Sequence, residues 1–143
     1  MRLRSSLCLP LLMAACAGGQ ASADGTGRAA AAPADAASAV ALAQQHFALI
    51  EQGRRVDAAA LWADKAEAAR FAAVLNGFKE IHGEFGPARY VILQDGTAKV
   101  PARIYGIQRD GEPISHPGYV LARRVGSDWR IVQIELQAPL PRL

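Results

Sequence analysis

The last third of the chain holds the feature that most limits its fold, a series of short β-type segments separated by turn residues. Between residues 90 and 137 we predict four strands joined by three tight turns. Asp95-Gly96 and Asp110-Gly111 are typical two-residue hairpin turns, because Asp-Gly accepts the positive φ angles of a type I′ turn. Gly126-Ser127-Asp128 is expected to form a three-residue turn. Such a meander has one apolar face, which upstream helices must cover.

The segment before the meander is predicted to begin with two helices. Ser38 is a suitable N-cap for a helix that ends at Gly53. The apolar residues of this helix recur at helical spacing, and they are Val40, Ala43, Phe47 and Ile50. Asp57 is expected to cap a second, short helix over residues 58–63, which carries Leu61 and Trp62.

A third and longest helix is predicted to begin after Asp64, which is a suitable cap. It contains Gly77, and its apolar stripe is formed by Phe71, Val74, Leu75, Phe78, either Ile81 or His82, and Phe85. The predicted fold class is therefore α+β, with three N-terminal helices packed on a curved four-stranded antiparallel sheet.

The turn positions also predict which residues of the strands face the core. The second hairpin is expected to place Tyr105 opposite His116, and Pro117-Gly118 to form a bulge that curls the sheet. In the last hairpin the core face is predicted to consist of Val120, Ala122, Val132, Ile134 and Leu136. The opposite face carries four large apolar residues among polar ones, namely Tyr119, Leu121, Trp129 and Ile131. This second face is either a homodimer or partner surface or simply a few exposed apolar residues.

The N-terminus is typical of an exported protein. Arg2 and Arg4 precede a short apolar segment, as in a signal peptide. Met13-Ala14-Ala15-Cys16 resembles the lipobox of bacterial lipoproteins, and this resemblance implies cleavage after residue 15, a lipid anchor on Cys16 and a location in the cell envelope facing the periplasm. The alternative is cleavage after Ala23, which would release a soluble periplasmic protein.

The predicted organisation is a signal peptide over residues 1–15, a flexible tether rich in Ala, Gly and Ser over 16–36, one α+β domain over 37–138 and a tail over 139–143. Cleavage of the leader removes Cys8, so the folded domain has no cysteine for a disulfide. It also removes Arg2 and Arg4, which lowers the excess of basic over acidic residues from three to one. A nearly neutral domain gives no electrostatic reason to expect a nucleic-acid partner.

The element order resembles that of the nuclear transport factor 2-like superfamily. The resemblance covers roughly residues 37–137 and depends on the helix pair from Phe47 to Trp62 and on the closing strand Asp128-Trp129-Arg130-Ile131-Val132. It implies a cone-shaped domain of the cystatin and nuclear transport factor 2 type. Members of this superfamily include small isomerases and other enzymes, as well as subunits without catalysis, so the likeness alone does not define a function.

Candidate site residues follow from the predicted faces and from this resemblance. Enzymes of the superfamily place an Asp or His in the pocket of the cone, and the resemblance therefore implies His82 or His116 as a general base. His46 is expected at a helix edge. The pocket is predicted to be lined by some of Phe47, Trp62, Phe71, Phe78, His82 and Tyr105. No metal-binding spacing and no cofactor motif are present in the sequence.

The function predicted from the sequence is that of an envelope lipoprotein that binds a small apolar ligand or a protein partner and catalyses no reaction. One alternative is a small isomerase, dehydratase or hydrolase with His82 or His116 as general base. Another is an accessory subunit of an envelope assembly that docks through the face containing Trp129. A cone filled by its own aromatic residues would favour binding, whereas a polar group with a perturbed pKa in an open cavity would favour catalysis.

Overall fold

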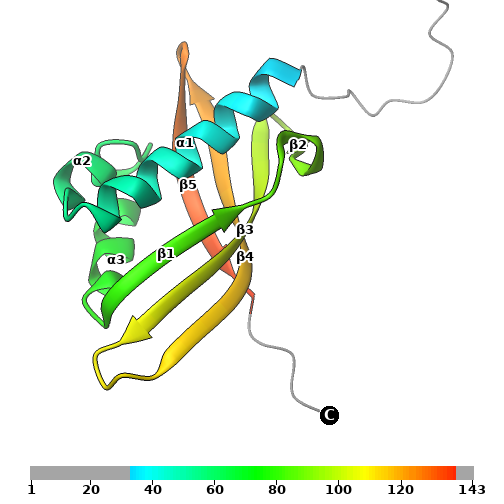
Figure 1. Cartoon of the computed structure of the whole chain (residues 1–143). Helices are drawn as coiled ribbons and strands as arrows, with labels where there is room; N and C mark the ends of the chain where they lie inside the picture. The colour runs from blue at the N-terminus through cyan, green and yellow to red at the C-terminus, as the bar shows by residue number, and fades with distance from the viewer. Residues whose placement is uncertain (1–32, 138–143) are drawn as a thin grey trace, which may run out of the picture.

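Three helices precede a bent antiparallel sheet in the computed structural model, which describes residues 33–137 (Figure 1). Strands β1, β3, β4 and β5 lie side by side in that order, and the short strand β2 pairs with the first residues of β3. The elements are α1 (Pro33–Glu51), α2 (Arg55–Ala59), α3 (Lys65–Leu75), β1 (Phe78–Phe85), the 3-10 helix η1 (Ala88–Tyr90), β2 (Ile92–Gln94), β3 (Thr97–Gln108), β4 (Pro113–Val125) and β5 (Asp128–Leu136). The predicted α+β class, with N-terminal helices against a curved antiparallel sheet, is confirmed.

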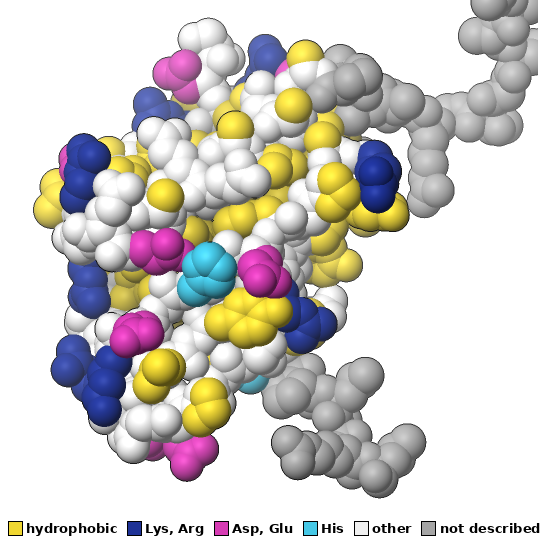
Figure 2. Space-filling model, in the orientation of Figure 1, with side chains coloured by type: hydrophobic (Ala, Val, Ile, Leu, Met, Phe, Trp, Pro, Cys, Tyr) yellow, Lys and Arg dark blue, Asp and Glu magenta, His cyan; other side chains and the backbone are white. Residues whose placement is uncertain are grey.

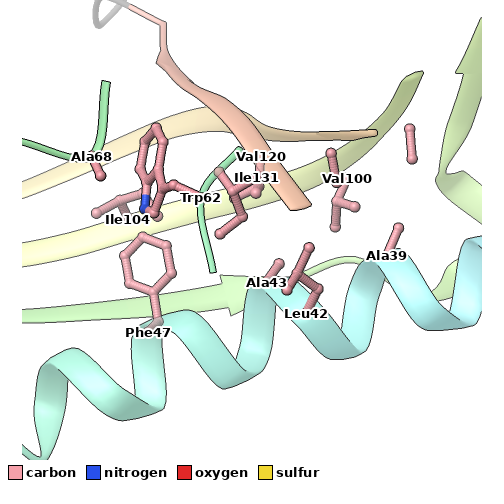
Figure 3. Close-up of a cluster of buried hydrophobic side chains, with 12 residues drawn as sticks. Ala39, Leu42, Ala43, Phe47, Trp62, Ala68, Val100, Ile104, Val120 and Ile131 are labelled. Atoms are coloured by element: carbon pink, nitrogen blue, oxygen red, sulfur yellow. The ribbon is translucent and has the colours of Figure 1, made fainter. Parts of the chain in front are cut away.

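The core lies between α1 and the concave face of the sheet, as Figure 3 shows. Side chains of α1 point from one side and side chains of β3, β4 and β5 from the other, with Trp62 entering between them. The buried members of this cluster are Ala39, Leu42, Ala43, Phe47, Trp62, Ala68, Ala98, Val100, Ile104, Val120, Ala122 and Ile131. Small alanines on α1 allow the helix to approach the sheet closely, so one helix covers most of the concave face.

The third helix is shorter than predicted, because it ends at Leu75 and residues 78–85 form strand β1 instead. Ile81 and Phe85 both face the core, and their spacing of four residues fits either two strand repeats or about one helical turn. This ambiguity caused the error. Gly77 therefore lies between a helix and a strand, and the longest helix is α1 with 19 residues.

Two of the predicted helix caps are wrong and one is confirmed. Ser38 lies inside α1, which begins at Pro33, so the predicted domain boundary at residue 37 also falls within this helix. The Ser38 hydroxyl donates to the carbonyl of Ala34 at 2.8 Å. Asp57 lies within α2 and pairs with Arg54 at 2.8 Å instead of capping the helix. Asp64 does cap α3, since its carboxylate accepts from the backbone N–H of Ala66 at 2.6 Å.

The three turns differ in how well the sequence predicts them. Asp95 and Gly96 both have positive φ, at 52° and 70°, as a type I′ turn requires. In the second hairpin only Gly111 has positive φ, and its N–H donates to the Gln108 carbonyl at 2.9 Å, so the turn is one residue longer than predicted. Tyr105 therefore lies opposite Ser115 and not opposite His116. In the third hairpin Val125 pairs with Asp128, which leaves a two-residue turn.

A bulge in β5 changes the predicted faces of the last hairpin. The register between β4 and β5 shifts between Leu121 and Ala122, so that Ile131 lies opposite Ala122. Ile131 is fully buried, whereas Leu136, which was predicted in the core, is 43% exposed. Pro117-Gly118 forms no bulge, because β3 and β4 pair there without a shift. The prediction of a bulge at that position was therefore wrong.

Candidate functional site

The interior between α1 and the sheet is filled by aromatic residues of the chain itself. Phe47, Trp62 and Phe71 surround His46, with ring centroids 5.2, 5.7 and 5.6 Å from the His46 ring. A void of about 10 Å³ remains beside them, which is roughly the space of one water molecule. Phe47 and Trp62 are buried in the core and Phe71 packs against it, so the role of these three residues as pocket residues stays a prediction.

His46 is buried, contrary to the prediction that it lies at a helix edge. The indole N–H of Trp62 donates to His46 Nε2 at 2.9 Å, which leaves the ring proton of the neutral imidazole on Nδ1. Burial lowers the pKa of His46 to about 4. The ring is 1% exposed and contributes to the packing of the aromatic cluster.

An open cleft of about 570 Å³ lies beside this filled interior. It is bounded by the last turn of α1, the last residue of α3, the first half of β1 and the hairpin between β3 and β4. Its apolar lining consists of Ile50, Leu75, Phe78, Ile81, Ile107, Pro113 and Ile114. Of the predicted pocket residues, Phe78, His82 and Tyr105 do line this cleft.

Phe78 takes its place in the cleft because the sheet has no side chain beneath it. A Cβ on Gly106 would lie 3.0 Å from Phe78 Cδ1, which is closer than ordinary packing permits. The register between β1 and β3 also shifts between Phe78 and Glu80, so that the start of β1 departs from regular pairing. These two local features together position the ring of Phe78 over β3.

Polar groups form the rim of the cleft on the side of β1. Nδ1 of His82 donates to Oε1 of Glu51 at 2.6 Å, and the hydroxyl of Tyr105 donates to Oε2 of Glu84 at 3.0 Å. The His82 and Tyr105 rings are stacked, with centroids 6.3 Å apart and planes 29° apart. The hydrogen bond to Glu84 is the main cause that raises the pKa of Tyr105. Figure 2 shows this arrangement as a histidine between acidic side chains, next to exposed hydrophobic groups.

Glu51 and Glu84 were not predicted as site residues. Glu51 is 31 residues from His82, and the two meet only because α1 packs along β1. One signal was present in the sequence, since Glu51 follows Phe47 by four residues and so lies on the same side of α1. Because the sequence does not show where β1 lies, it could not identify His82 as the partner of Glu51.

The second predicted base, His116, lies elsewhere. It is half-buried opposite Ile104 in the pairing of β3 with β4, and it does not line the cleft. Within residues 33–137, no group of three His, Cys, Asp or Glu side chains is arranged to hold a metal ion. None of the helices described in that range is long and apolar enough to cross a membrane.

The predicted partner surface of the last hairpin is divided between two faces. Ile131 is buried in the core, and Trp129 packs against the same cluster. Tyr119 and Leu121 are half-buried and lie between core positions of β4, on the outer face of the sheet. The four residues therefore do not form one surface. Dimerisation stays a prediction, but these residues cannot provide a single interface for it.

Comparison with known proteins yields the fold and no function. No protein-family model and no curated protein matches the sequence. Two solved structures are similar in shape, the Kfla4162 protein from Kribbella flavida and a protein of unknown function with a cystatin-like fold from Nostoc punctiforme. The first has a TM-score of 0.57 and 16% identity, and the match covers 76% of this chain and 93% of the other. The second has a TM-score of 0.55 and 17% identity, with 76% and 95% covered. The fold of this domain is therefore cystatin-like.

Proposed function

We propose that this protein is a non-catalytic binding module of the bacterial envelope, whose cleft beside β1 takes a small, mainly apolar ligand. The observation that carries the proposal is an open, largely apolar cleft of about 570 Å³ next to an interior that its own aromatic rings fill. Ligand pockets in proteins commonly measure about 300–1,000 Å³ and combine an apolar lining with a few polar groups. The cleft has both properties, with His82, Tyr105 and two carboxylates at its rim.

Binding of the neutral fluorescent probe N-phenyl-1-naphthylamine tests the proposal. We expect the probe to bind the protein with enhanced fluorescence, and the variant Phe78→Ala to bind it about tenfold more weakly, because a large apolar contact of the cleft is removed. Val74→Ala is the matched control, since Val74 is 50% exposed on α3 and does not line the cleft. Equal affinities of the Phe78 and Val74 variants would contradict the proposal.

A second candidate function is favoured by the short contact between Glu51 and His82. A carboxylate that holds one ring nitrogen of a histidine leaves the other as a general base, which is the arrangement an isomerase, dehydratase or hydrolase would use. Against it, the pair is exposed, with 57% of the His82 side chain and 41% of the Glu51 side chain accessible. Turnover of a bound ligand that His82→Gln abolishes would establish the enzyme in place of the binding module.

We also propose that the domain belongs to the nuclear transport factor 2-like superfamily and that a lipid on Cys16 anchors it. The cystatin-like fold supports the first part. Cys16 lies outside the described residues, so the lipobox alone supports the second. Mass spectrometry of the mature protein is expected to find a diacylglyceryl-modified Cys16 as its first residue. A mature chain that begins at Asp24 would instead indicate the soluble periplasmic form.

A further inference from the structure

Nε2 of His82, at the rim of the cleft, is a hydrogen-bond acceptor that is open to a ligand. Glu51 Oε1 accepts from Nδ1 of this ring, so in the neutral imidazole the lone pair lies on Nε2. Nε2 makes no hydrogen bond to any residue between 33 and 137, and the ring lines both the cleft and a second groove between α1 and β1.

The two carboxylates nearest this ring each accept one hydrogen bond from the chain itself. Glu51, on α1, accepts from His82, and Glu84, on β1, accepts from Tyr105 on β3. The remaining charged groups that line the cleft are Arg55, Lys79 and Glu80. Arg55 donates to the side-chain carbonyl of Asn76 at 2.9 Å. A ligand that reaches His82 therefore meets an unoccupied acceptor beside an apolar surface.

The carboxylate of Glu51 fixes the tautomer in which Nε2 is the acceptor. A histidine that donates one ring N–H to a carboxylate is held in one tautomer, and its other nitrogen then carries the lone pair. An imidazole nitrogen forms its strongest hydrogen bond with an acidic O–H group. An ordinary alcohol is a weaker donor, and an ether is not a donor at all.

We propose that the ligand carries a weakly acidic hydroxyl group, of the phenol or enol type, which donates a hydrogen bond to Nε2 of His82 while the apolar body of the ligand lies in the cleft. This inference rests on the proposed function, because it names the class of ligand for the same cleft. His82 is the residue that contacts the ligand, and Glu51 is the residue that positions it.

Two probes that differ by one hydrogen-bond donor test the inference on the mature protein. The probes are 4-tert-butylphenol and its methyl ether, 4-tert-butylanisole, and calorimetry measures their affinities. We expect the phenol to bind about tenfold more tightly, as one hydrogen bond to a strong acceptor implies. In His82→Phe the two affinities become equal because the phenol loses its advantage, and in Glu51→Gln the difference shrinks. Glu67→Gln, on the exposed side of α3, keeps the full difference.

Nitrogen NMR of the imidazole rings gives a second readout that a purely structural role would not change. The Nε2 resonance of His82 is expected to move when the phenol is added and to stay in place with the anisole, while His46 stays constant in both. Equal affinities of the two probes for the unmodified protein overturn the inference and leave the binding function intact. Tighter binding of the cation 4-tert-butylbenzylamine would also overturn it, because the acidic rim would then select for positive charge. If no probe binds, both the inference and the binding function fail.

Discussion

Burial changes the acid–base chemistry of His46. The neutral ring accepts a hydrogen bond from Trp62 and packs among three aromatic side chains. Protonation would place a charge in this apolar surrounding, which explains why burial lowers the pKa of His46 to about 4 from an ordinary value of 6.5. The packing of the interior therefore depends on this ring being neutral.

The free energy of unfolding is expected to fall as the pH is lowered from 6.5 to 4. In this interval the unfolded chain binds a proton at His46 that the folded chain does not, so stability rises with pH and is lost as pH falls. The free energy of unfolding is highest above pH 6.5, where His46 is neutral in both the folded and the unfolded chain. By pH 4 it is lower by about 3 kcal/mol. Urea unfolding followed by tryptophan fluorescence at several pH values measures this change.

The control for this prediction is His46→Gln, which keeps a side-chain acceptor for Trp62 and does not titrate. We expect the variant to have a flatter dependence on pH over the same interval, although it is less stable at pH 7. If the two proteins had parallel profiles, the acid sensitivity would come from other groups.

At the scale of single elements, helix α3 depends on its cap. The Asp64 carboxylate accepts from the backbone N–H groups of Ala66 and Glu67, which have no partner within the helix. We expect Asp64→Ala to lower the free energy of unfolding by about 1 kcal/mol, as the loss of an N-cap usually does. Thermal or urea denaturation at neutral pH measures it.

Asp57→Ala is the matched comparison, because the sequence suggested that both aspartates cap helices. Asp57 makes only an exposed ion pair with Arg54, and such pairs contribute roughly 0–1 kcal/mol. We expect a change of less than about 0.5 kcal/mol. A larger loss for Asp57→Ala than for Asp64→Ala would contradict the assignment of the caps.

The sequence predicts the elements well where local chemistry determines them. Asp95-Gly96 was predicted correctly because the type I′ turn depends on those two residues alone. Residues 78–85 were predicted as helix because Phe78, Ile81 and Phe85 are spaced by three and four residues, and only pairing with β3 makes this segment a strand. The bulge in β5 likewise depends on a neighbouring strand, so Ile131 was assigned to the wrong face.

At the scale of the whole molecule, the aromatic residues of the interior and those of the cleft differ in how deeply they are buried. Phe47 is 1% exposed and contacts both the aromatic cluster and the position of Gly83, where a Cβ would lie 2.9 Å from its ring. Phe78 is only half-buried at the cleft. The sequence named both as pocket residues, because it shows which residues are apolar but not how the helices close over the sheet.

We expect Phe47→Ala to destabilise the domain by about 3–5 kcal/mol, because it leaves a cavity in a packed core. Phe78→Ala is expected to cost markedly less, since part of its ring is already in contact with solvent. Denaturation curves of the two variants, recorded side by side, measure the difference. Comparable losses would show that the cleft is part of the stabilising core.

Rings from the chain itself occupy the space between α1 and the sheet, so recognition is left to the cleft, whose floor shares Ile50 and Leu75 with the core and whose outer part is less buried. Substitutions in that outer part, at Ile107 or Pro113 for example, can then alter selectivity while the melting temperature stays nearly constant. A scaffold of this kind tolerates diversification, because related chains can keep one architecture and still recognise unrelated molecules.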